Sequence, residues 1–172
     1  SPAKEPPTSV VETFHASLLS VMKEARDLGP KGRFQRLREP IEQAFDLRLT
    51  IRIATGSFWR KASQEQKTRL VDAFKRMSIS NYASQFDGYS GQSFKTIGEN
   101  PGPQNTTLVK TQIIDPGSGP VDITYVTRKF DGQWKAIDVL LDTGISELAV
   151  RRSEYRRILK TGGINGLIDI LN

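Results

Sequence analysis

The chain has 172 residues, of which 37% are hydrophobic and 26% are charged, and its formal net charge is +6. A chain of this length buries about two thirds of the surface that it exposes when unfolded, so a single domain can fold without a metal or a disulfide. The absence of cysteine excludes disulfide scaffolds, thiolate metal sites and thiol nucleophiles, and the single histidine excludes a two-histidine metal site. We therefore expect a soluble basic domain with no cofactor and no metal.

The N-terminal segment 1–8 is rich in proline and lacks an apolar pattern, so we expect a disordered lead-in before one domain at 9–172. The first helix is predicted to start at a capping box formed by Ser9 and Glu12 and to end at Gly29-Pro30. Its buried face is indicated by apolar residues at helical spacing, which are Val11, Phe14, Leu18, Met22 and Ala25.

The next amphipathic stretch, 34–45, is predicted to be helical but divided by Pro40, which cannot donate a hydrogen bond within a continuous helix. Residues 47–53 alternate between apolar and polar side chains, as a strand does, yet they follow a helix without a turn signal. Their pattern alone leaves strand and helix open.

Ser63 and Gln66 form a second capping box, which opens a long helix that ends at Asp87-Gly88.

The second half of the chain is predicted to begin with four strands, at 92–99, 106–114, 121–130 and 133–141. The connections are short, and Asp131-Gly132 is typical of a two-residue hairpin, so neighbouring strands should be antiparallel. Ser146 is expected to cap a final helix from Glu147 to about Lys160, ended by Gly162-Gly163. Helices followed by a meander and a helix indicate an α+β fold.

Few residues suit catalysis. Asp138 and Asp142 are carboxylates near apolar residues, and a buried aspartate can act as a base, although a hydrogen-bonded aspartate at the end of a strand explains them equally simply. His15 lies beside an apolar helical stripe, where a hydrogen-bonded boundary histidine is more common than a general base. The sequence contains no nucleophile-elbow, phosphate-loop or dinucleotide-binding pattern.

The final helix carries an unusual arginine. Arg151 falls within an apolar stripe at helical spacing, whereas Arg152 does not; the stripe is formed by Leu148, Tyr155, Ile158 and Leu159. An arginine in this position either extends its charge outward to water or pairs with an anion. An anionic lipid headgroup and an acidic docking partner both fit.

Five segments follow one another along the chain: Phe45-Asp46, TGSFWR at 55–60, FDGYSG at 86–91, WKAIDVLLDTGIS at 134–146 and RSEY at 152–155. This ordered set resembles the MlaC/toluene-tolerance family of periplasmic lipid-binding proteins. The sequence at 54–56, 86–91 and 145–149 is most similar to the hopanoid-associated HpnM branch. The resemblance spans about residues 10–171, and the ordered set is specific although each motif alone is weak.

The resemblance implies an NTF2-like cone, in which a four-stranded twisted sheet is wrapped by N-terminal helices and a C-terminal helix around an apolar cavity. It also implies that 47–53 is helical. The implied function is that of a periplasmic carrier, with its signal peptide removed, that shuttles phospholipid or hopanoid between the inner and outer membranes and so maintains the outer membrane. The implied partners are an inner-membrane lipid transporter and an outer-membrane acceptor complex. We expect a monomer that binds no nucleic acid and is not an enzyme.

We expect the lipid to contact apolar residues on helix and strand faces that meet: Phe58, Trp59, Val71, Phe74, Met77, Tyr82, Phe94, Val109, Tyr125, Val139, Leu141, Ile145 and Tyr155. Arg151 and Arg152 are the candidates for headgroup or docking contacts.

Two alternative functions stay open at this point. One is an enzyme on the same cone that acts on a steroid-like or triterpenoid-like substrate with Asp138 as base. The other is a cationic module that binds nucleic acid.

Overall fold

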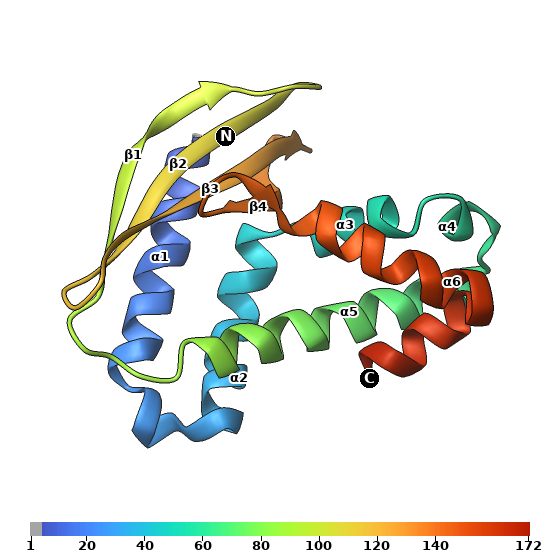
Figure 1. Cartoon of the computed structure of the whole chain (residues 1–172), viewed down its shortest axis with the longest axis horizontal. Helices are drawn as coiled ribbons and strands as arrows, with labels where there is room; N and C mark the ends of the chain where they lie inside the picture. Colours follow the sequence, from blue (N-terminus) through green and yellow to red (C-terminus); the bar gives the residue numbers. More distant parts are fainter. Residues whose placement is uncertain (1–4) are drawn as a thin grey trace.

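One antiparallel sheet forms the second half of the chain in the computed structural model, which describes residues 5–172 (Figure 1). The strands follow the chain order and are β1 (Ser93–Pro101), β2 (Thr106–Asp115), β3 (Gly119–Phe130), β4 (Gln133–Leu141) and β5 (Ile145–Ser146). The four predicted strands are confirmed. The expected total of four is wrong, because the two-residue β5 pairs with the end of β4 before the last helix begins.

Hairpin geometry explains the sheet order. Asp131 and Gly132 both have positive φ, 49° and 77°, which is the backbone of the two-residue turn that their sequence indicates. This turn sets the register of β3 on β4, with Phe130 opposite Gln133. The register shifts once within this pair, between Val126 and Thr127. The likeness to an NTF2 cone stays a prediction.

Six helices precede and follow the sheet. They are α1 (Pro7–Lys23), α2 (Ala25–Ala44), α3 (Leu47–Thr55), α4 (Ser57–Lys61), α5 (Gln64–Gln85) and α6 (Glu147–Leu171). Figure 1 shows α1 and α2 beneath the curved sheet, α3, α4 and α6 beyond its edge, and α5 crossing α2 and running on alongside α3 and α6. Of the expected lead-in 1–8, residues 1–4 lie outside the described residues, while Pro7 and Thr8 belong to α1.

The helix boundaries correct three predictions. The capping box of Ser9 and Glu12 is wrong, since α1 starts at Pro7, and its N-cap is Pro6, which makes no side-chain cap bond. The first helix ends at Lys23 rather than at Gly29, whose φ of 66° instead bends the chain within α2. Pro40 does not divide α2. It removes one donor to the carbonyl of Arg36, and this residue is exposed, so water can satisfy the carbonyl.

Other boundaries agree with the sequence or extend it. Residues 47–55 form the helix α3, whose N-cap Asp46 accepts a hydrogen bond from the Leu49 amide at 3.0 Å. The capping box of Ser63 and Gln66 is confirmed at the start of α5. The last helix bends at Gly163, with φ of 62°, and then continues to Leu171. It continues because Ile164, Leu167 and Ile168 of its second segment are buried.

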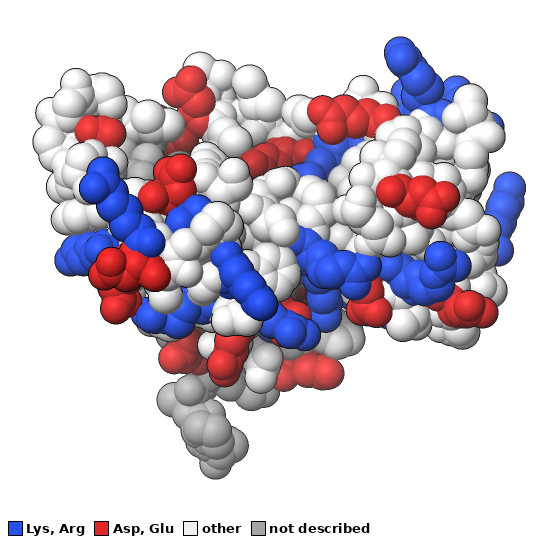
Figure 2. Space-filling model, turned by 90° about the horizontal axis from the view of Figure 1, so that it is seen from below, with Lys and Arg blue, Asp and Glu red and all other residues white. Residues whose placement is uncertain are grey.

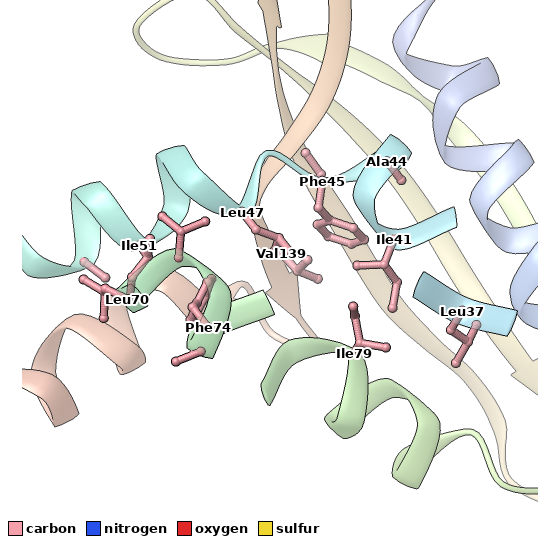
Figure 3. Packing of buried hydrophobic residues seen from close by; sticks show 14 of the residues in the cluster. Leu37, Ile41, Ala44, Phe45, Leu47, Ile51, Leu70, Phe74, Ile79 and Val139 are labelled. Carbon is pink, nitrogen blue, oxygen red and sulfur yellow. The ribbon is translucent and has the colours of Figure 1, made fainter. Parts of the chain in front are cut away.

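The core lies where the two helical groups meet the inner face of the sheet. In Figure 3, Leu37 and Ile41 of α2, Ile51 of α3 and Phe74 of α5 belong to one row of buried side chains, with Val139 of β4 near its middle. The first four of these side chains are at most 1% exposed. The helices are therefore anchored to β4 by apolar burial, and this packing fixes their positions around any hollow that remains.

Candidate functional site

A cavity of about 400 Å³ lies between α5, the first turns of α6 and the inner face of the sheet. Its deep wall is formed by buried side chains from three elements, which are Leu18, Tyr125 and Val139. Its outer wall includes the exposed residues Asn81, Ser84 and Gln85 of α5. The remaining lining residues are Ser78, Tyr82, Phe86, Phe94, Ile123, Leu141, Glu147 and Arg151. A volume of this size is within the range of small-molecule sites.

A second hollow of about 40 Å³ adjoins the first and extends toward the core. The two share Ser78, Tyr82, Val139, Glu147 and Arg151 as lining residues. The smaller hollow adds core side chains to this set, namely Ile41, Phe45, Leu47, Phe74, Ile137 and Leu148, together with Thr50 and Asp138. Polar groups thus lie where the open cavity meets the apolar interior.

The structure brings together six of the thirteen residues expected to contact lipid. Five line the larger cavity, and they are Tyr82, Phe94, Tyr125, Val139 and Leu141. Phe74 lines the smaller hollow. The seven others line neither hollow and are Phe58, Trp59, Val71, Met77, Val109, Ile145 and Tyr155. Trp59 lies between Arg48 and Lys67, whose charges are 5.1 and 5.5 Å from its ring, and Ile145 is 59% exposed.

The residues that sequence reasoning missed are mostly polar. Ser78, Asn81 and Gln85 follow Phe74 at spacings of three or four residues, so they continue its face of α5. They were not predicted as lipid contacts because only apolar residues were chosen. Their helical spacing from Phe74 is the sequence signal that could have identified them. Their amides and hydroxyls make one wall of the cavity able to bind polar groups.

The aromatic residues of the deep wall form a connected cluster. The ring of Phe14 contacts Phe45, Tyr82 and Tyr125 with centroid separations of 5.1, 5.6 and 6.4 Å, each near a right angle. Phe14 also borders a separate hollow of about 410 Å³ between α1, α2 and the start of β4. These edge-to-face contacts therefore separate two hollows on opposite sides of one aromatic cluster.

His15 is buried within this wall and hydrogen-bonded, in agreement with the sequence expectation. Its Nε2 lies 2.8 Å from the hydroxyl oxygen of Tyr125, and the ring of Phe94 stacks on it with centroids 4.1 Å apart. Burial lowers the pKa of His15 from 6.5 to about 4. Burial likewise raises the pKa of Tyr125 and of Tyr82 above the ordinary value of 10.0. The wall is therefore uncharged at neutral pH.

Two opposite charges face the cavity from α6. Arg151 is half-buried, with its guanidinium 5.5 Å from the centre of the Phe74 ring and 3.8 Å from the sulfur of Met77. Glu147 lies one turn earlier, and burial raises the pKa of its carboxyl while the Arg151 charge opposes this rise. Arg152 is exposed and lines neither hollow. The helical-wheel placement of Arg151 is therefore confirmed.

Asp138 has a structural role that contradicts its assignment as a base. Its carboxylate accepts hydrogen bonds from the amides of Val139 and Leu148, at 2.7 and 3.0 Å, and from the hydroxyl of Ser146. It therefore caps the first turn of α6 and joins that helix to β4. Both carboxylate oxygens take part in this cap, which accounts for the position of Asp138 without a catalytic role.

The basic excess of the chain is partly gathered in a groove of about 580 Å³ between α3 and the β3–β4 hairpin. Four basic side chains border it, Arg48, Arg52, Arg128 and Lys135, with only Asp46 and Asp131 as acidic neighbours. By contrast, Figure 2 shows Lys and Arg intermingled with Asp and Glu over the face seen from below. Four basic against two acidic side chains give this groove a net charge of +2, which is one part of the +6 of the chain.

Within residues 5–172, no group of histidine and carboxylate side chains is arranged to hold a metal ion. In the same residues, no helix has both the length and the apolar character needed to cross a membrane. The fold and the cavity together define a class of protein in which a helix-covered sheet borders a hollow with a buried apolar deep wall and a polar rim that opens to solvent.

The family model of the MlaC protein matches residues 12–172, so this chain belongs to the MlaC family. One relative is the intermembrane phospholipid transport system binding protein MlaC of Haemophilus influenzae, which is 28% identical over 117 residues. That match covers 66% of this chain but 54% of the relative, so the chain spans about half the length of that protein.

The fold has a counterpart among solved structures. The phospholipid-binding protein from Ralstonia solanacearum, solved in complex with a phospholipid, superimposes with a TM-score of 0.85 and 24% sequence identity. The match covers 97% of this chain and 95% of that one. The same α+β fold is therefore established over almost the whole chain.

Proposed function

We propose that this protein is a lipid carrier, which binds the acyl or polycyclic part of a lipid in the cavity between α5, α6 and the sheet. The observation that carries the proposal is the cavity of about 400 Å³ in a member of the MlaC family. Each methylene group removed from water contributes about 0.8 kcal/mol, so a closed apolar sleeve is enough for binding without a catalytic constellation. Phospholipid and hopanoid are the two candidate cargoes.

The proposed place of action is the periplasm, where the carrier shuttles lipid between the inner and outer membranes. An inner-membrane lipid transporter and an outer-membrane acceptor complex would be its partners. Support comes from the relative in Haemophilus influenzae, which is named as the binding protein of an intermembrane phospholipid transport system. The proposed contacts are the six predicted residues that line the two hollows, together with Leu18, Phe86 and Ile123.

Native mass spectrometry of the purified protein, followed by lipid extraction, tests the proposal. We expect a lipid adduct whose extracted mass identifies a phospholipid or a hopanoid. Recovery of no lipid, together with no binding of either class in titration, would refute the carrier function.

A variant that fills the cavity makes the test specific. Ile123 is half-buried and lines the cavity, so Ile123→Trp should reduce lipid retention about tenfold by occupying the ligand volume. Ile97→Trp is the matched control, since Ile97 is 53% exposed on β1 and should leave retention unchanged. Thermal melting of both variants distinguishes a filled cavity from a loss of fold. Equal retention by the two folded variants would place the lipid elsewhere.

A further inference from the structure

Glu147 and Arg151 are opposite charges that both line the cavity without forming an ion pair with each other. The ion pairs formed by residues 5–172 join Arg36 to Glu24, and Arg38 and Lys75 to Glu42. Neither Glu147 nor Arg151 takes part in any of them. Half-buried charged groups are normally paired with an opposite charge. Removing a charged group from water costs free energy, and an unpaired charge does not recover that free energy. The Arg151 charge acts on Glu147 without a direct ion pair, so the two residues present adjacent charges of opposite sign, which matches a ligand that carries both signs.

The backbone at the start of α6 has reduced capacity to bind an anion. The Leu148 amide donates to Asp138 and the Ala149 amide donates to Ser146, so two of the free amides at this helix end are already occupied. The Arg151 guanidinium contacts the Phe74 ring, the Met77 sulfur and the Tyr155 side chain, none of which is an anion at neutral pH. An anionic group in the cavity would therefore bind the Arg151 guanidinium, which has several donors in a planar fork.

Glu147 provides a negative charge in the same cavity wall as the Arg151 guanidinium. It lies one helical turn before Arg151, and both residues line the smaller hollow as well as the larger one. Burial raises the pKa of the Glu147 carboxyl, which means that the empty cavity stabilises its charge poorly. A ligand ammonium placed beside it would restore that stabilisation. The polar side chains of Asn81, Ser84 and Gln85 line the same cavity and can solvate the rest of a headgroup.

We propose that Glu147 and Arg151 select a lipid whose headgroup contains both a phosphate and a primary ammonium, as phosphoethanolamine does. The phosphate contacts Arg151, the ammonium contacts Glu147, and the tails extend toward the deep wall formed by Leu18, Tyr125 and Val139. This inference rests on the carrier function proposed above. Headgroups with a phosphate and a neutral glycerol, or with hydroxyls alone, leave Glu147 without a partner.

Competition between two lipids with identical chains tests the proposal. The delipidated protein is incubated with vesicles of equal parts phosphatidylethanolamine and phosphatidylglycerol, and the retained lipids are quantified by native mass spectrometry. We expect the wild type to favour phosphatidylethanolamine about tenfold, the ratio expected for one charge-assisted contact. Glu147→Gln should bring the ratio close to one without reducing total retention of phosphatidylglycerol. Arg151→Gln should reduce retention of both lipids.

Matched controls come from the same helix. Glu154 and Arg152 are exposed and line neither hollow, so Glu154→Gln and Arg152→Gln should preserve the wild-type ratio. A wild-type ratio near one, or a preference that survives Glu147→Gln in a folded protein, would overturn the headgroup proposal and leave the carrier function standing. Failure of the wild type to retain either lipid would instead exclude phospholipid as the cargo, and a further failure to bind hopanoid would overturn the carrier function.

Discussion

His15 illustrates how one buried side chain makes stability depend on pH. The folded protein holds the pKa of His15 at about 4, whereas the unfolded chain has the ordinary value of 6.5. Between these values the unfolded state binds a proton that the folded state does not, so stability is complete above pH 6.5 and decreases as the pH falls toward 4. The loss is about 1.4 kcal/mol per pH unit, or about 3 kcal/mol in total.

Urea unfolding at pH 7 and pH 4.5 measures this effect when the wild type is compared with a double variant, His15→Phe with Tyr125→Phe. Both hydrogen-bond partners are replaced together, so neither Nε2 nor the Tyr125 hydroxyl is left unpaired. Glu147 acts with the opposite sign, because its pKa is raised, but it is present in both proteins and cancels in the comparison. An equal loss of stability in both proteins would contradict the role given to His15.

At the scale of elements, one carboxylate joins a strand to a helix. Asp138 on β4 accepts hydrogen bonds from the Leu148 amide and the Ser146 hydroxyl at the start of α6, and from the adjacent Val139 amide, so Asp138→Ala should destabilise the fold by about 2–3 kcal/mol. Asp169→Ala is the control, since Asp169 is exposed on the same helix and its loss should change stability by less than about 0.5 kcal/mol. Chemical unfolding of both variants measures the difference. If the two variants were equally stable, the capping role would be wrong.

The elements also show where the sequence is informative. The four main strands and the Asp131-Gly132 hairpin follow from local alternation and turn chemistry, which need no knowledge of distant contacts. Residues 47–53 show where local pattern is not enough, because their alternation of apolar and polar residues is typical of a strand. They form a helix because Asp46 caps its first turn and Ile51 packs in the core. The bend at Gly29 and the continuous helix through Pro40 likewise depend on tertiary packing that local propensity does not contain.

For the whole molecule, the cavity was less predictable than the fold. Its volume is what remains after side chains from several elements have packed, so composition cannot distinguish a filled core from a hollow one. Apolar type identified Tyr82, Phe94 and Tyr125 but also selected Val71 and Val109, which are buried in the core. The helical wheel did place Arg151 correctly, because a charge on an apolar stripe is a local signal.

A property of the whole molecule provides the last prediction, since a ligand that binds only the folded state raises its stability by mass action. At a free lipid concentration 100 times the Kd, this gain is about 2.7 kcal/mol, which corresponds to a rise in Tm of about 5–10 °C for a chain of this size. Thermal melting of delipidated protein with and without solubilised phosphatidylethanolamine measures it. Glycerophosphoethanolamine, which has the headgroup without tails, should give almost no shift, because methylene burial supplies most of the binding energy. Equal shifts with both compounds would show that the headgroup alone binds, and an apolar carrier cavity would then be the wrong description of this hollow.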